Sequence, residues 1–166
     1  MLGVYENFPE NIHKLTDFVI STSTKRFQQT LIQLLNEANN KTFDLEDVTE
    51  PAIPQCTVTL EFGIAEANNF NYLDKEETNK ILRAIYKKIL QTIDFYCVLK
   101  YYKTQKDKKI PLRFDYYMIR FTFNKNLVRM QIFHERGPRY TSPEDITKFV
   151  FNGINRIFSR KMLKKV

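Results

Sequence analysis

Aromatic and cationic residues alternate along three segments in the second half of the sequence. Within each segment they lie two or four positions apart. Side chains at such spacings share one face of a β-strand, so the three segments would present them together. Exposed rings stack on bases, and Lys and Arg pair with phosphates, which is what a single-stranded nucleic acid requires. The residues with this spacing are Tyr96, Lys100, Tyr102, Tyr116, Arg120, Arg129 and Phe133.

The predicted contacts form a stacking set and a phosphate set. The predicted stacking set is Tyr96, Tyr102, Tyr116 and Phe133. The predicted phosphate set from the sheet and its flanks is Lys100, Arg113, Arg120, Arg129, Arg136 and Arg139. The structural alternative is that a helix covers this face, with the rings as ordinary packing and the cations at its rim.

A catalytic interpretation is also open for the segment 134–139. There His134 could act as a base, with Arg136 and Arg139 as an anion clamp. However, His134 falls on an apolar strand face, which is typical of a core or edge histidine. Glu61, Glu66 and Asp74 could come together near one end of the sheet and hold a divalent cation, although a polar loop is the simpler explanation of that segment. No nucleophile lies beside a base, so the sequence predicts a non-enzymatic protein without a metal site.

Charge is distributed unevenly along the chain. Residues 1–100 hold ten Lys and Arg against fourteen Asp and Glu, whereas residues 101–166 hold sixteen against five. With a sequence pI near 9.3, this asymmetry predicts a basic surface that meets phosphates or an acidic partner.

Composition excludes several classes of protein. Four glycines leave no room for a glycine-rich phosphate loop, so no cofactor is predicted. No apolar run approaches the ~20 residues of a membrane span, and the first residues lack the features of a signal peptide. Cys56 and Cys97 fall at apolar strand positions, as buried thiols do. We therefore expect a cytoplasmic protein that does not bind a membrane.

Hydrophobic periodicity predicts one α+β domain over residues 1–166. We expect an antiparallel sheet of about four strands with helices packed beside it, in the order helix, strand, helix, three-stranded meander, helix. The segment 15–20 suits a strand or a helical turn. The predicted helices cover residues 23–37, 74–92 and 142–158, and the predicted strands cover residues 57–64, 95–102, 112–123 and 127–135.

The register of the last hairpin decides which side chains share a face. Pairing Phe123 with Val128 places Ile119 opposite Ile132 on an apolar face. The same register places Tyr116 opposite Glu135 on the mixed face that carries the predicted contacts.

The segment from Leu15 to Leu31, LTDFVISTSTKRFQQTL, resembles the opening of the archaeal single-stranded DNA-binding proteins called ThermoDBP. The resemblance implies a sheet with helices beside it and a cleft of aromatic and basic residues that takes a single strand. It adds Lys25 and Arg26 to the phosphate set. It also implies that the C-terminal helix can mediate a homodimer.

The sequence thus predicts a protein that binds single-stranded DNA or RNA, with DNA favoured and with little sequence preference. One alternative is an interaction or homodimerisation module that docks an acidic protein. A second alternative is a small metal-dependent hydrolase or nuclease that uses Glu61 or Glu66.

Overall fold

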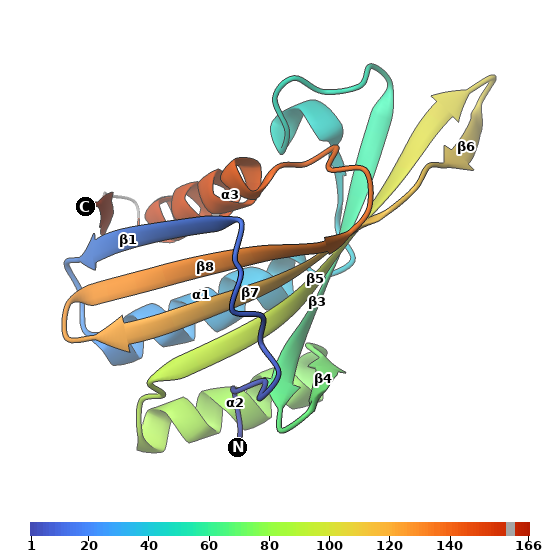
Figure 1. The fold of residues 1–166 in the computed structure, drawn as a ribbon. Helices are drawn as coiled ribbons and strands as arrows, with labels where there is room; N and C mark the ends of the chain where they lie inside the picture. Colours follow the sequence, from blue (N-terminus) through green and yellow to red (C-terminus); the bar gives the residue numbers. More distant parts are fainter. Residues whose placement is uncertain (159–161) are drawn as a thin grey trace.

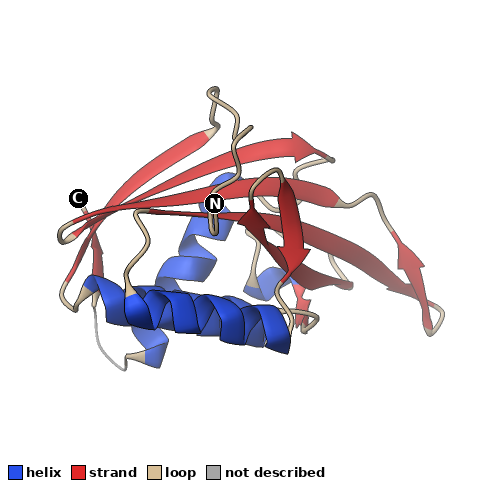
Figure 2. Cartoon of the chain, turned by 90° about the horizontal axis from the view of Figure 1, so that it is seen from below, coloured by secondary structure: helices blue, strands red, loops and turns tan. Residues whose placement is uncertain are grey.

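One antiparallel sheet organises the chain in the computed structural model, which describes residues 1–158 and 162–166. Within these residues the sheet has nine strands, in the order β2-β3-β5-β7-β8-β1-β9, with β4 beside β3 and β6 beside β5. All three helices lie on one face of this bent sheet (Figure 1, Figure 2). The strands are β1 (Lys14–Ile20), β2 (Thr42–Asp44), β3 (Cys56–Glu66), β4 (Asn69–Tyr72), β5 (Thr92–Gln105), β6 (Lys108–Pro111), β7 (Asp115–Asn124), β8 (Leu127–Arg136) and β9 (Leu163–Lys165).

Each helix begins at a side-chain cap that the sequence contains. The hydroxyl of Ser23 accepts the Arg26 amide before α1, and the carboxylate of Asp74 accepts the Glu77 amide before α2. Ser142 forms a reciprocal capping box before α3. The three predicted helices are confirmed, but the second is shorter than expected. The helices are α1 (Thr24–Ala38), α2 (Lys75–Lys87) and α3 (Pro143–Ile157), with a 3-10 turn, η1 (Leu45–Asp47).

The α+β class is confirmed, whereas the expectation of about four strands is wrong. The predicted strands correspond to β3, β5, β7 and β8, and the ambiguous segment 15–20 is β1. The four strands with no predicted counterpart have three or four residues each, too few to show an alternating pattern. Residues 104–109 form the tip of the β5–β6 hairpin. Its two central residues, Lys106 and Asp107, have φ of 51° and 61°, which fits the tight turn that twisted strands favour.

The apolar face of the sheet and the helices form the core. Phe95 and Phe121 on the sheet and Leu31 and Ile154 on the helices are all buried in it. The predicted register is confirmed from Phe123 with Val128 to Ile119 with Ile132. Burial of α3 residues such as Ile154 in the chain's own core does not test a homodimer through this helix, which stays a prediction.

The register departs from prediction at one point, where a β-bulge follows Tyr116. Tyr116 pairs with Arg136 rather than with Glu135. A bulge adds one residue to one strand and shifts every later pairing. It therefore brings a guanidinium, not a carboxylate, opposite the ring.

The opposite face of the sheet, here called the outer face, carries no helix. Instead, the N-terminal segment, residues 1–13, runs across it (Figure 1). Hydrogen bonds from the Gly3 amide to the Ala65 carbonyl and from the Asp94 amide to the Gly3 carbonyl hold this segment down. The structural alternative, in which a helix covers the predicted contacts, is therefore wrong, because a different segment covers part of this face.

A buried carboxylate, that of Asp115, lies at the end of the sheet from which the β5–β6 hairpin projects. Asp115 is fully buried and accepts hydrogen bonds from the Tyr101 hydroxyl at 2.6 Å and from the Arg139 amide at 2.7 Å. The Nε2 atom of His134 lies 2.9 Å from Oδ1 of Asp115, the same oxygen that accepts the Arg139 amide. Gly137, at φ 117°, lets the chain approach, since an added Cβ would lie 2.3 Å from the Phe114 carbonyl oxygen. This network ties the start of β7 to β5, to β8 and to the loop that precedes α3.

The structure also bears on the expectations for the two cysteines and for membrane-spanning helices. Both cysteines are free and buried, and burial raises the pKa of the Cys97 thiol. Among the described helices none is long and apolar enough to cross a membrane.

Candidate nucleic-acid interface

Three of the predicted phosphate contacts lie on the outer face, each paired with a carboxylate from a neighbouring strand. The Lys100 ammonium lies 2.7 Å from Glu61, and this bond raises the pKa of Lys100. The Arg129 guanidinium binds Asp17 through two nitrogens, at 2.8 and 3.1 Å, and lowers the pKa of that carboxyl. Such pairing neutralises the middle of the face.

The third pair, Arg120 with Asp94, lies beneath the N-terminal segment. Asp94 is fully buried and accepts both Arg120 nitrogens, at 2.7 and 2.8 Å, and also the Tyr5 amide. Arg120 also donates to the Tyr5 carbonyl, and the Phe8 ring lies 4.4 Å from its guanidinium carbon. A phosphate would have to displace these partners, so Arg120 has a structural role here.

A set of rings lies along the outer face, from Phe70 on β4 to Tyr102 and Phe114 at the base of the β5–β6 hairpin. We call this the aromatic patch; its members are Phe70, Tyr96, Tyr102, Phe114 and Tyr116, all half-buried. The Tyr96 centroid lies 5.4 Å from that of Phe70 and 6.4 Å from that of Tyr116. Tyr102 meets Phe114 edge to face at 6.0 Å. Burial, followed by the nearby Glu135 carboxylate, raises the pKa of Tyr96 to about 12, so this hydroxyl stays protonated.

Arg136 binds the patch directly, because the bulge has placed it opposite Tyr116. Its guanidinium carbon lies 3.9 Å from the Tyr116 centroid, a close cation–π contact. The side chain is 65% exposed, and its approach to Glu135 is long, at 3.8 Å. Arg136 therefore keeps donors available at the edge of a ring surface.

Phe133 lies apart from the patch, although the sequence placed it in the same stacking set. The His13 ring of the N-terminal segment stacks on it at 5.1 Å. Burial, with the positive charges of Arg139 and His134 nearby, lowers the pKa of His13 and favours its neutral form. One side of Phe133 is thus occupied by the chain itself.

The β5–β6 hairpin adds positive charge beside the aromatic patch. It projects from the body of the protein as an arm (Figure 1). Arg113 and Arg139 lie in loops at the same end of the sheet and are exposed, with no ion pair to a described residue. The exposed lysines of the hairpin, which we call the lysine arm, are Lys103, Lys106, Lys108 and Lys109, against one acid, Asp107.

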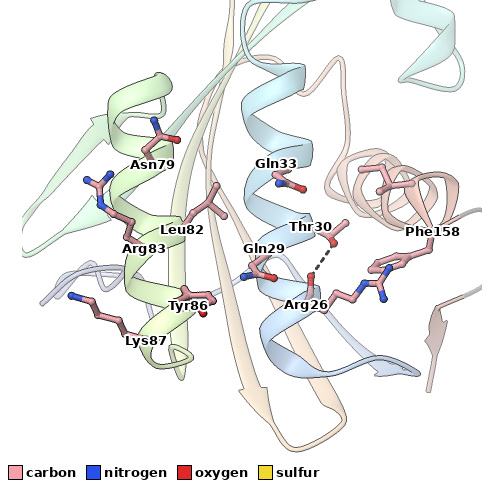
Figure 3. A pocket seen from close by; sticks show the side chains of 11 residues that line it. Arg26, Gln29, Thr30, Gln33, Asn79, Leu82, Arg83, Tyr86, Lys87 and Phe158 are labelled. Atoms are coloured by element: carbon pink, nitrogen blue, oxygen red, sulfur yellow. Dashed lines mark hydrogen bonds between the residues drawn. The ribbon is translucent and has the colours of Figure 1, made fainter.

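Lys25 and Arg26 lie on the other side of the molecule, with the helices. The Lys25 ammonium sits 5.1 Å from the Tyr86 ring, and the Arg26 guanidinium 5.2 Å from the Phe158 ring. Arg26 lines a groove of about 890 Å³ across the helices (Figure 3). The structure therefore divides the predicted phosphate contacts between two opposite surfaces.

The residues considered for metal-dependent hydrolysis already have basic partners. Glu61 binds Lys100, and Glu66 binds Lys80 at 2.7 Å and accepts from Asn71. Over the part of the chain that the structure describes, no three acids, histidines or cysteines gather as a metal site. His134, the candidate base, is held against Asp115.

Comparison with known proteins adds no family to this description. No protein-family model, no curated protein and no solved structure matches the chain. The fold and its surfaces define an α+β protein with a bent antiparallel sheet, and the likeness to ThermoDBP at residues 15–31 stays a prediction.

Proposed function

We propose that this protein binds single-stranded nucleic acid at the aromatic patch, with phosphates held by Arg136, Arg113 and Arg139 and by the lysine arm. The observation that carries the proposal is the contact of Arg136 with Tyr116 within a row of half-buried rings. Among the described residues, Arg136 combines a ring contact with only a long approach to a carboxylate, whereas Arg120 and Arg129 on the same face are closely paired with carboxylates.

The arrangement favours a single strand over a duplex. A base can stack on a tyrosine only when it is unpaired or splayed out, whereas lysines on a projecting arm attract any phosphate backbone. Every base has a flat face, so stacking distinguishes poorly among sequences. We therefore expect little sequence preference, with DNA and RNA both as candidate ligands and no cofactor.

Replacing Tyr102 and Tyr116 with Ala is expected to weaken binding of a labelled oligothymidylate by about tenfold for each ring, because a stacked base contributes ~1–3 kcal/mol. Fluorescence anisotropy measures the affinity, and circular dichroism checks that both variants stay folded. Tyr86→Ala is the matched control, since this tyrosine is 71% exposed and lies on the helix side.

Loss of affinity in the Tyr102 and Tyr116 variants, with none in Tyr86→Ala, supports the proposal. Equal affinity of all three folded variants would remove the aromatic patch from the interface.

A further inference from the structure

The groove across the helices has a mixed floor and basic borders. Its centre is made by Leu82, Tyr86 and amide side chains from α1 and α2, helices that pack against each other. Figure 3 shows Arg83 and Lys87 on the side of α2 that faces away from α1, and Arg26 at the opposite border beside Phe158. The lining residues are Arg26, Gln29, Thr30, Gln33, Asn79, Leu82, Arg83, Tyr86, Lys87, Ile157 and Phe158.

No Asp or Glu is among the described residues that line this groove. Arg26, Arg83 and Lys87 form no ion pair with any described residue. Three cations around an apolar centre are therefore left without a counter-charge by the chain. This differs from the outer face, where Lys100, Arg120 and Arg129 are each paired.

We propose that this groove docks an acidic amphipathic helix of a partner protein. In this mode an apolar stripe at helical spacing lies along the groove while charges on its flanks meet the borders. Here the stripe would cover Leu82 and Tyr86. Acidic residues on one flank would meet Arg83 and Lys87, and those on the other would meet Arg26. Gln29, Gln33 and Asn79 supply amide donors to the same carboxylates.

The groove fits such a helix better than it fits a nucleic acid strand. Its cations lie on two separate borders, whereas a single strand presents its phosphates along one line. Its aromatic rings also have cations against them already, Lys25 on Tyr86 and Arg26 on Phe158. A carboxylate can bind these cations while they stay against the rings. A base would have to displace the cation in order to stack on the ring.

The experiment uses a labelled synthetic peptide of about 15 residues, with leucines at helical spacing and glutamates on both flanks. A peptide of the same composition in scrambled order measures attraction by charge alone. We expect saturable binding of the ordered peptide by fluorescence anisotropy, and at least about tenfold weaker binding to the Arg83→Glu, Lys87→Glu double variant. The control double variant, Lys148→Glu with Lys164→Glu, changes the charge equally at exposed positions outside the groove.

Two further measurements make the result decisive. Tyr86→Ala should also weaken binding of the ordered peptide, because it removes apolar contact area without disturbing the core. Binding of an oligothymidylate should be the same for the Arg83, Lys87 double variant and for the control. This readout is independent of the peptide, so the two proposals can fail separately.

Three results would overturn the proposal. Equal binding of the ordered and scrambled peptides would mean general charge attraction. Equal losses in the groove and control variants would place the peptide elsewhere. Oligothymidylate binding that is lost only in the Arg83, Lys87 double variant would assign the groove to nucleic acid.

Discussion

The Asp115→Ala variant is expected to lose about 4 kcal/mol of unfolding free energy, a large part of the stability of a domain of this size. The change leaves the Tyr101 hydroxyl and the Arg139 amide without their acceptor inside the core, where an unsatisfied polar group costs free energy. It also removes the carboxylate that faces His134. Urea denaturation followed by circular dichroism measures the effect.

Asp107→Asn is the matched control for this variant. Asp107 is exposed in the hairpin turn, and asparagine tolerates its positive φ. Its midpoint in urea should equal that of the unchanged protein. A loss below about 1 kcal/mol in Asp115→Ala would contradict the role of this carboxylate as the acceptor at the end of the sheet.

The Arg120→Ala and Arg129→Ala variants should differ sharply in stability, although both residues lie on the same face of neighbouring strands. Removing Arg120 leaves the fully buried Asp94 carboxylate without its counter-charge and should lower the unfolding free energy by about 3 kcal/mol. The partner of Arg129, Asp17, is solvated, so its loss should leave the unfolding free energy almost unchanged. Urea denaturation of both variants measures the difference.

A double variant separates the cost of an unpaired buried charge from the cost of losing the packing contacts of Arg120. Replacing Arg120 with Met and Asp94 with Leu removes both charges and should restore much of the stability lost in Arg120→Ala. The N-terminal segment should also become more sensitive to protease in Arg120→Ala, because the Tyr5 carbonyl loses a donor. Equal stability of Arg120→Ala and Arg129→Ala would contradict the structural role given to Arg120.

The long elements of the fold could be predicted from the sequence because their signals are local. Caps at Ser23, Asp74 and Ser142 mark the helix starts, and alternation marks the long strands. Short strands carry no such signal, since three residues cannot show a period. The length of α2 was overestimated because residues 88–91 are compatible with a helix but lead into β5 instead.

The candidate site was predicted less well, because its charges are set by contacts between distant parts of the chain. The acidic and basic parts of the sequence do not form separate parts of the structure. For example, β1, from the acidic residues 1–100, pairs with β8, from the basic residues 101–166. Asp17 thus reaches Arg129 across 112 positions, and Glu61 reaches Lys100 across 39. No spacing rule along one strand reveals such pairs.

The bulge at Tyr116 was the other feature that the sequence did not show. Strict alternation predicts Glu135 opposite Tyr116, whereas the bulge places Arg136 there. The close turn that Gly137 allows beside Asp115 is the signal that could have indicated an irregular register.

The two proposed surfaces lie on opposite sides of the sheet, so each can be occupied without blocking the other. The helices lie on one face of the sheet (Figure 2) and carry the groove (Figure 3), whereas the aromatic patch belongs to the outer face. A protein with this arrangement could hold a single strand on one side while a partner docks on the other.

The central claim is tested most directly by an anisotropy titration of the unchanged protein against labelled single-stranded and duplex DNA, at about 50 and about 200 mM salt. The account predicts binding to the single strand at both salt concentrations, because stacking on the aromatic patch does not depend on counterions. It predicts that duplex binding disappears at the higher salt. Equal binding to both forms that is abolished at the higher salt, or no binding at all, would contradict it.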